Sequence, residues 1–457
     1  MAKKLNKANL SIDEKLEQVK VVSEYEPYKV PQNWCWTYLE SINQFISRSV
    51  NPTSESNKLF ELYSVPSSQE NYPEIIQGGD IGSTKQSVKK DDVLLCKINP
   101  RINRVWIVSK YTENALIASS EWIVVRNSII SSKYLMWCMR SPYFREYMLS
   151  NVSGIGGSLM RAKPEHVKKY PIALAPLPEQ YRIVEHIETM FSKLDEAKEK
   201  AQEILNTLEI RKNSILNKAF SGKLTKKWRK EHKIRHDSWK SSLVSECCKL
   251  GSGGTPSRRN SSYYTGNIPW IKTGEINWNI VNDSEEKITH EAIENSSAKI
   301  YDPGAVLVAM YGMGITRGKA AILGVKATTN QAVCVLQTNE NLYNRFLFYF
   351  FMSNYWNIRE QAVGGNQLNL SATIIGKLNI VIPKLDEQKE IVKILDDFIY
   401  KENETKQSAE YVIEQIDLMK KSILSKAFRG ELGTNNPKDE SAEELLKQIL
   451  TGDTNAN

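Results

Sequence analysis

The sequence of 457 residues has no long hydrophobic run. Apolar stretches such as Phe346 to Met352 are far shorter than the roughly 20 residues that cross a bilayer. The start, Met-Ala-Lys-Lys-Leu-Asn-Lys, lacks the apolar region of a signal peptide. We therefore expect a cytoplasmic protein that does not associate with membranes.

Cysteine is scarce, and its six positions (35, 96, 138, 247, 248 and 334) contain no Cys-x-x-Cys motif. This distribution is typical of a reducing compartment, where each thiol is a small buried hydrophobe, so we expect no disulfides. His232 and His236 are one helical turn apart and not far from Cys247 and Cys248. Adjacent cysteines rarely ligate one tetrahedral ion well, so we expect no metal site.

Catalytic motifs are also missing. The Asn/Asp-Pro-Pro-Tyr/Phe tetrapeptide of adenine methyltransferases is absent. The segment Gly312 to Lys319 has the wrong glycine spacing for a phosphate-binding loop and is followed by Ala320 instead of Ser or Thr. The acids of Asp386 to Lys389 lie at an expected helix start, where they favour the helix dipole. We expect no catalytic residues and no cofactor bound by this chain.

The net charge is +8 and the isoelectric point is near 8.9, which is compatible with a polyanionic partner but shared by many enzymes. Residues 211–235 contain ten Lys or Arg residues and one acid, Glu231, with Trp228 among them. This segment is either a solvated linker or a direct phosphate contact, and the sequence favours neither.

The chain contains an internal duplication. Residues 213–224 and 421–432 are identical at eight of twelve positions, at a shift of 208 residues. The same shift aligns Leu177-Pro-Glu-Gln180 with Leu385-Asp-Glu-Gln388, so one register without gaps covers 156–224 against 364–432. Upstream the copies diverge and need gaps. The two halves therefore share a scaffold and differ in what it presents.

Within the matched part, residues 179–220 predict one long helix with an apolar stripe at steps of three and four, and the stripe recurs 208 residues later. Each helix should be roughly 60 Å long at about 1.5 Å per residue. A single apolar stripe must be buried, and the duplicate stripe is the obvious partner. We expect the two helices to pack antiparallel as a coiled coil.

Before each helix lies a segment of about 150 residues with short strand-like runs, such as 93–98, 104–108, 121–126, 305–310 and 332–336. A helix-like stretch follows in each, 134–149 and 345–361. The predicted fold class is α+β, with two mixed α/β domains separated by two long antiparallel helices in a pseudo-twofold repeat. The expected order is an N-terminal extension (1–28), a first domain (29–178), a helical region with linker (179–237), a second domain (238–386), a second helical region (387–432) and a tail (433–457).

Several motifs in this order resemble the specificity subunits of type I restriction-modification systems. The helical spacer of that family is matched by Pro-Leu-Pro-Glu-Gln-x-Arg-Ile-Val at 176–184, by Lys-Ala-Phe-Ser-Gly-Lys-Leu-Thr at 218–225 and by Trp228-Arg229. The second domain resembles a target-recognition domain through Gly-Gly-Thr-Pro-Ser at 253–257, Ile-Pro-Trp-Ile-Lys-Thr-Gly-Glu at 268–275 and Gly-Asn-Gln-Leu-Asn-Leu-Ser at 365–371. The resemblance covers residues 26 to 432.

The resemblance implies that the chain reads a bipartite double-stranded DNA target with two recognition domains and is not itself an enzyme. It implies two modification subunits that carry S-adenosylmethionine and methylate adenine, and two restriction subunits that use ATP and Mg²⁺. The first domain departs from the pattern, because it lacks Gly-Gly-Thr-Pro and has Ser158-Leu-Met-Arg161 where the second has Asn366-Gln-Leu-Asn369. The resemblance therefore supports the DNA contacts of the first domain less strongly than those of the second.

Candidate DNA-contacting residues follow from glycine-rich or basic loops, which offer backbone access, hydroxyls and guanidiniums. In each case the alternative is an ordinary surface loop. Asn and Gln could pair with adenine edges, although Ser371 nearby is more safely interpreted as a helix cap. The second-domain candidates are Gly253, Gly254, Thr255, Ser257, Arg258, Arg259, Lys272, Arg317, Lys319, Gln367 and Asn369, and those of the first domain are Lys97, Arg101, Arg104 and Arg161.

Two other classes of function compete with this interpretation. A stand-alone nuclease or methyltransferase for bipartite sites would need the catalytic motifs that are missing. A coiled-coil adaptor without nucleic acid would not need two dissimilar domains on one repeated frame. The sequence therefore favours a DNA reader that serves as a scaffold for other subunits.

Overall fold

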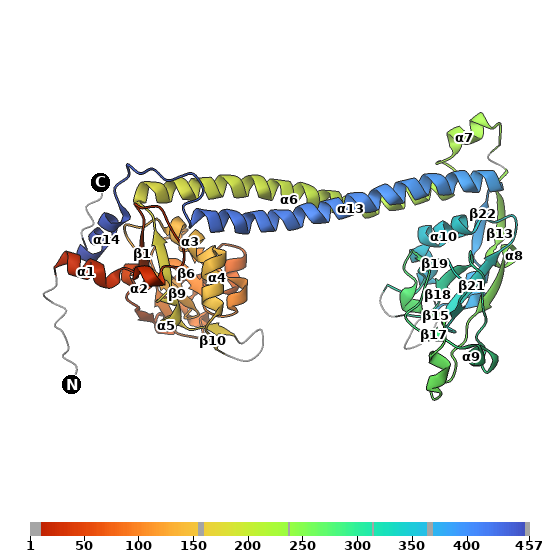
Figure 1. Ribbon diagram of the computed structural model, residues 1–457, viewed down its shortest axis with the longest axis horizontal. Coiled ribbons are helices and arrows are strands. Elements are labelled where there is room, and N and C mark those ends of the chain that lie inside the picture. Colours follow the sequence, from red (N-terminus) through yellow and green to blue (C-terminus); the bar gives the residue numbers. More distant parts are fainter. Residues whose placement is uncertain (1–10, 154–159, 236–237, 313–314, 363–368, 453–457) are drawn as a thin grey trace. The chain divides into compact units, whose positions relative to one another are not determined.

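The computed structural model describes residues 11–153, 160–235, 238–312, 315–362 and 369–452. The chain forms two compact units (Figure 1). The first unit combines residues 1–200 with 412–457, and the second consists of residues 201–411. Among the described residues, no helix is both long enough and apolar enough to cross a membrane.

The first unit is built on two antiparallel strands, β1 (Cys35–Tyr38) and β12 (Pro171–Leu174). A five-stranded sheet has the order β2-β5-β8-β3-β4, with bounds Ser49–Val50, Lys85–Ser87, Ala115–Ala118, Leu59–Tyr63 and Glu74–Gln77. A three-stranded sheet has the order β7-β6-β9, with bounds Val105–Ile107, Val93–Cys96 and Trp122–Val125. The short pair β10 (Val152–Ser153) and β11 (Arg161–Ala162) completes the strands, and the helices are α1 (Ile12–Val19), α2 (Leu39–Ile42), α3 (Ser132–Arg140), α4 (Pro142–Leu149) and α5 (Pro164–Val167).

The second unit also contains a two-stranded pair, a five-stranded sheet and a three-stranded sheet. Strands β13 (Lys240–Leu243) and β22 (Asn379–Ile382) pair antiparallel. The five-stranded sheet has the order β14-β21-β18-β19-β16, with bounds Cys248–Ser252, Val333–Thr338, Val306–Ala309, Ala320–Leu323 and Ile280–Val281. A second sheet, β17-β15-β20, has bounds Lys287–Ile288, Ile268–Ile271 and Thr328–Thr329, and the helices are α8 (Val244–Cys247), α9 (His290–Glu294), α10 (Asn344–Ser353), α11 (Tyr355–Glu360) and α12 (Ala372–Gly376).

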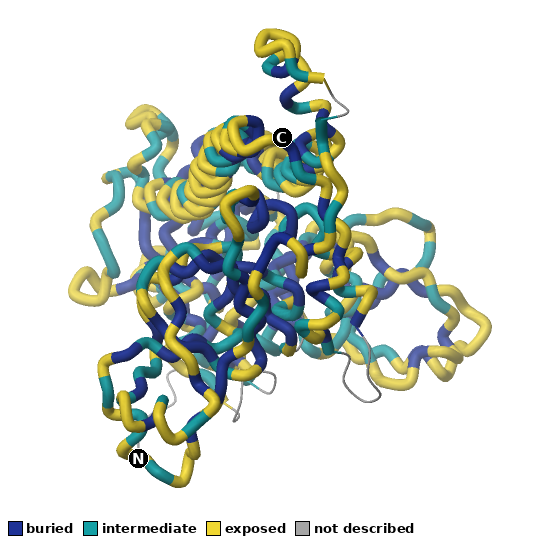
Figure 2. Tube along the Cα trace, turned by 90° about the vertical axis from the view of Figure 1, so that its right-hand side faces the viewer, coloured by how far each residue is buried: buried dark blue, intermediate teal, exposed yellow. Residues whose placement is uncertain are grey.

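Each unit has its own hydrophobic core, and in each a helix packs on the central strands. In the first unit, Tyr134 of α3 and Phe144 of α4 are fully buried beside Tyr170. In the second unit, Phe346 and Phe351 are buried on α10, which packs against β19 and β18. Figure 2 shows the buried residues gathered inside the units, with exposed residues on the outward side of the long helices. All six cysteines are buried and unpaired.

The predicted strands are confirmed, and the stretches 134–149 and 345–361, predicted to be helix-like, are largely helical. Each stretch forms two helices, with breaks at Ser141 and Asn354. Ser141 precedes Pro142 and has an extended backbone, ψ 151°, because a residue before proline is pushed out of the helical region. The sequence contained that signal, whereas nothing comparable marks Asn354.

The two long helices are α6 (Leu177–Phe220) and α13 (Leu385–Ala427), of 44 and 43 residues. Within the first unit, Lys198 pairs with Asp417 at 2.7 Å and Asp195 pairs with Lys420. Within the second, Arg211 pairs with Glu402 at 2.6 Å. The partner numbers fall along α13 as they rise along α6, so the helices pack antiparallel, as predicted. Short helices follow each, α7 (Lys226–Glu231) and α14 (Ala442–Thr451).

The repeated Glu-Gln pair anchors the start of each long helix. Gln180 accepts a hydrogen bond from the Ser131 N–H at 3.0 Å, and its counterpart Gln388 accepts one from the Tyr343 N–H at 2.7 Å. The preceding acids, Glu179 and Glu387, are fully buried. The sequence assigned the acids of Asp386 to Lys389 to the helix dipole, whereas the structure uses Glu387, like Glu179, as a buried acceptor that joins its helix to the flanking segments.

Glu387 accepts hydrogen bonds from the Trp239 indole at 3.1 Å and the Thr225 hydroxyl at 2.7 Å, and it pairs with the Arg229 guanidinium at 2.5 Å. This network ties Thr225 and Arg229, which follow α6, and Trp239 to the Glu-Gln pair at the start of α13. A buried carboxylate needs such partners, because its desolvation is otherwise costly.

Candidate nucleic-acid interface

The candidate loops of the two units occupy the same place on the repeated frame. Residues 97–104 connect β6 to β7, and residues 310–319 connect β18 to β19. The Cys96 N–H donates to the Arg104 carbonyl and the Ala309 N–H to the Lys319 carbonyl, both at 3.0 Å. Arg104 and Lys319 are therefore equivalent positions, each directly before the returning strand.

A second segment meets each loop in the same way. The Ala162 N–H donates to the Lys97 carbonyl at 2.8 Å, and the Leu370 N–H donates to the Met310 carbonyl at 3.0 Å. These donors are 208 residues apart, so Arg161 and Asn369, one residue earlier, are also equivalent. Gln367 lies outside the described residues. The structure thus brings Arg104 and Arg161 to one end of the sheet in the first unit, and Lys319 and Asn369 to the matching end in the second.

In the first unit the loop between β6 and β7 is held in a fixed shape. Asn99 and Asn103, which flank a short 3₁₀ turn, have left-handed backbones with φ of 51° and 52°. The Asn103 amide donates to the Met139 carbonyl at 3.0 Å. Asparagine tolerates this conformation better than other residues with a Cβ. The turn leaves the side chain of Arg101 exposed to solvent.

Arg161 pairs with Ile98, just before this turn, in an isolated antiparallel bridge. Its Nε is 3.4 Å from Oε2 of Glu121, and both side chains remain partly exposed. The Lys97 N–H donates to the Glu121 carbonyl at 3.0 Å, so the acid belongs to the same cluster. Glu121 therefore orients Arg161, a role that sequence spacing does not indicate, since the two residues are 40 positions apart.

In the second unit, Lys319 is oriented by a neighbouring strand connection. Its ammonium donates to Oδ1 of Asn277 at 2.7 Å. Burial, and secondarily the charge of Arg359, lower the pKa of the Lys319 ammonium. Arg359 also donates to the Arg317 carbonyl at 2.6 Å. Gly318 between the two candidates has φ of +87°, a conformation that favours glycine.

The glycines of the Gly-Gly-Thr-Pro segment are buried against the protein itself. A Cβ on Gly253 would clash with the Thr329 carbonyl, and one on Gly254 would clash with the Ala298 N–H. The Trp270 indole donates to the Gly254 carbonyl at 2.9 Å. These positions therefore require glycine for internal packing. Thr255, next in the chain, is exposed and its hydroxyl bonds to Gln331.

Two of the basic candidates in this region meet the same carboxylate. Arg258 and Lys272 pair with Glu286 at 2.5 and 2.9 Å. The hydrogen bond from Arg258, and secondarily that from Lys272, hold the pKa of Glu286 below its usual value. The Arg258 guanidinium also stacks over the Tyr264 ring at 4.1 Å. Arg258 and Lys272 are thus braced by the fold.

Ser257 and Arg259 are exposed beside this braced cluster. Within the described ranges, Arg259 has no ion pair, so its charge is available to a ligand. Further along the chain, the Ser371 hydroxyl accepts the Ile374 N–H at 3.2 Å and caps α12, as predicted.

Comparisons with known proteins show what the chain is similar to. Residues 236–415 match the family model described as a type I restriction modification DNA specificity domain. The specificity subunit of the type I restriction enzyme EcoR124I/EcoR124II from Escherichia coli is 29% identical over 164 residues. This alignment covers 35% of the present chain and 40% of that relative, so the chain spans about two fifths of the relative's length.

Two solved structures share the fold over most of the chain. One is a chain from the structural work on complex assembly and conformational transition of the type I R-M system, with a TM-score of 0.72, 19% identity, and coverage of 89% of this chain and 100% of that one. The other is the HsdS subunit from Thermoanaerobacter tengcongensis, with a TM-score of 0.63, 20% identity, and coverage of 89% and 99%. Residues 236–415 are therefore similar to type I restriction modification DNA specificity domains, and the chain shares its fold with the two solved structures over most of its length.

Proposed function

We propose that this chain is the DNA-reading specificity subunit of a type I restriction-modification complex. It binds a bipartite double-stranded target, with residues 29–178 reading one half and residues 238–386 reading the other. The carrying observation is the equivalence of the two loop pairs: Arg104 and Lys319, and Arg161 and Asn369, occupy the same positions on one frame with different side chains. Such a frame suits two half-sites that differ in sequence.

The side chains divide into two groups by their surroundings. Exposed cations such as Arg101 and Arg259 are suited to phosphate oxygens, which position a protein on the duplex without reading sequence. Arg161 and Lys319 are oriented by Glu121 and Asn277, and together with Asn369 they are suited to base edges, where arginine and lysine prefer guanine and asparagine prefers adenine. Arg258 and Lys272 position the neighbouring loop.

The long helices α6 and α13 of the regions 179–237 and 387–432 serve in this proposal as the scaffold for modification and restriction subunits, two of each. Exposed apolar residues recur on them at the repeat distance: Ile204 and Val412 are 43% and 42% exposed, and Ile210 and Leu418 are 70% and 49% exposed. A surface that occurs twice supports two copies of one partner. The chain acts in the cytoplasm, contributes no catalytic group, and leaves S-adenosylmethionine, ATP and Mg²⁺ to its partners.

A domain exchange tests the proposal. Residues 238–386 would be replaced by the matching segment of a related specificity subunit, and the methylated motif would be determined by methylome sequencing of the host. We expect one half of the motif to change and the other to remain. The proposal fails if both halves change, or if the purified chain alone methylates or cuts DNA.

A further inference from the structure

The basic segment after α6 is not used by the recognition loops. Helix α7 projects from the end of α6, on the side facing away from the sheets that carry those loops (Figure 1). Lys223, Lys226, Arg229 and Lys230 line a cavity of about 630 Å³ together with Ser221, Gly222 and Ile234. Among the residues that the structure describes, no carboxylate lines this cavity. Four cationic groups therefore converge on one space, which favours an anionic occupant.

Within the described residues, one of these four cations forms an internal ion pair. Arg229 is 5% exposed and pairs with Glu387, as described above. Lys223, Lys226 and Lys230 are exposed, and within the part of the chain that the structure describes none of them has an ion pair. The nearby acid Glu231 lies 3.9 Å from Lys227 and does not line the cavity. The Arg229 anchor thus holds three unneutralised lysines in place.

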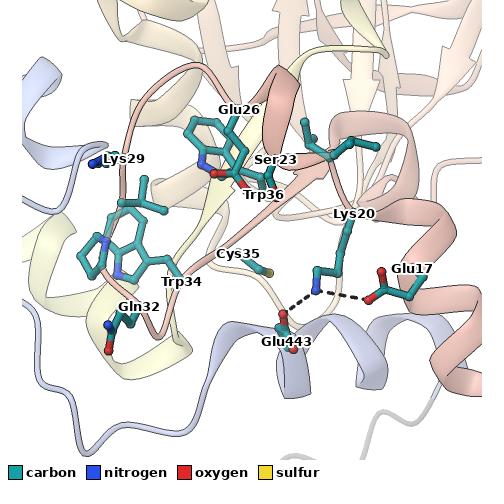
Figure 3. A pocket seen from close by; sticks show the side chains of 14 residues that line it. Glu17, Lys20, Ser23, Glu26, Lys29, Gln32, Trp34, Cys35, Trp36 and Glu443 are labelled. Atoms are coloured by element: carbon teal, nitrogen blue, oxygen red, sulfur yellow. Dashed lines mark hydrogen bonds and ion pairs between the residues drawn. The ribbon is translucent and has the colours of Figure 1, made fainter.

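The corresponding segment of the first unit is different. Residues 211–235 contain ten basic residues and one acid, whereas residues 419–443, at the repeat distance, contain five and four. A cavity of about 490 Å³ beside that tail holds Lys20 between Glu17 at 3.3 Å and Glu443 at 2.7 Å (Figure 3). Lys20 follows α1 and lies outside the corresponding segment, and both of its neighbouring acids neutralise it. The excess charge is therefore a property of the second unit and not of the repeated frame.

We propose that the cavity formed by Lys223, Lys226, Arg229 and Lys230 is a second DNA contact, which binds the phosphodiester backbone of a duplex without regard to sequence. It is separate from the recognition loops, so the chain holds a second DNA segment while its target is bound. Lysine ammonium groups suit this role, because they act as point charges on phosphates and carry no base preference. The inference extends the proposed function and rests on it only for the identity of the first duplex.

The test is a binding titration with the purified full chain. A fluorescein-labelled 20-base-pair duplex without the target is added to chain saturated with unlabelled target duplex, whose sequence comes from the methylome. The variant is K223Q/K226Q/K230Q. The control is K377Q/K393Q/K401Q, which removes the same charge from exposed lysines of the same unit that have no ion pair within the described ranges.

We expect the target-saturated wild type and the control to bind the labelled duplex, and the variant to bind it more than about tenfold more weakly at 0.1 M salt. The slope of log K against log salt should fall by about 2.7 in the variant, since each phosphate contact contributes about 0.9. Affinity for the target should stay within about twofold, because the recognition loops are unchanged.

Three outcomes would overturn the inference: no second duplex bound by wild type, equal binding by the variant, or equal loss in the control. If the variant instead binds DNA normally but no longer co-purifies with a protein subunit, the cavity holds an acidic protein surface and the DNA assignment is wrong. Failure of the chain to prefer any target would refute the proposed function alone, since the variant and control can still be compared on the labelled duplex.

Discussion

Glu179 and Glu387 occupy the same position at the start of the two long helices, but their surroundings differ in charge. Glu179 accepts hydrogen bonds from the neutral side chains of Trp34, Thr434 and Asn435, whereas Glu387 also pairs with the Arg229 guanidinium. The position of the buried carboxylate is therefore the same in both halves, but the groups that stabilise its charge differ between them. The same freedom appears at Arg104 and Lys319, where position is shared and chemistry is not.

The largest expected effect comes from Arg229→Met. It leaves Glu387 buried without its cation, so the free energy of unfolding of the second unit should fall by about 3–5 kcal/mol. Asn435→Ala removes one neutral donor from Glu179 and should cost the first unit about 1–3 kcal/mol. Denaturant titration measures both values, and amide hydrogen exchange assigns each to a unit. Equal losses would mean that the two anchors do not differ energetically.

A smaller loss is expected from Gly254→Ala, because its Cβ would meet the Ala298 N–H and Ser297. Overpacking of this kind costs about 1–3 kcal/mol. Gly274→Ala is the matched control, since no atom lies within 4 Å of its added Cβ. The melting temperatures of the two variants are compared by thermal unfolding. A drop for Gly254→Ala alone shows that the clash of the added Cβ causes the loss, and not the glycine-to-alanine change as such. A Gly254 variant as stable as the control would show that the loop relaxes freely.

Arg104→Gln and Lys319→Gln test whether equivalent positions act on separate halves of the target. Each should weaken binding by about 1–3 kcal/mol if it touches a base edge, and only for its own half-site. Binding to duplexes with one half-site scrambled gives the assignment. Asn277→Ala, which removes only the support for Lys319, should have a smaller effect in the same direction. Loss at both half-sites from a single variant would contradict the equivalence.

The smallest effects separate the neighbours Arg258 and Arg259. Arg259→Gln should reduce the slope of log K against log salt by about 0.9 with no change in thermal stability, since one phosphate contact is lost. Arg258→Gln should instead lower stability by about 0.5–1 kcal/mol through loss of its stacking on Tyr264. If the two variants behave alike, the bracing of Arg258 by Glu286 has no consequence for DNA.

The helices and the duplication could be predicted because they depend on local order. The apolar stripe and the 208-residue repeat lie in contiguous sequence, and Gln180 and Gln388 mark the same point in both copies. The break at Ser141 was missed although Pro142 announces it. The break at Asn354 has no comparable local mark in the sequence.

The candidate site could be predicted only in part. Basic and glycine-rich loops identified Arg104, Lys319 and Arg259 as candidates, but sequence cannot show which cation is already paired. Arg258 meets Glu286 across 28 positions, and the partner of Lys319 is Asn277, 42 positions away. Gly253 has no Cβ, and a Cβ there would clash with the carbonyl of Thr329 in a distant strand. Such pairings are set by topology, which one sequence does not specify.

The division of the chain into a contiguous and a discontinuous unit also has a consequence for synthesis on the ribosome. The second unit is complete once residue 411 has emerged, whereas the first, although begun earlier, still lacks residues 412–457. At roughly 5–20 residues per second, this wait lasts roughly 2–9 s. During it, Tyr134 and its neighbours lack Leu424 and Phe428, which bury them in the finished protein. The nascent first unit is therefore the part of this chain most in need of a chaperone.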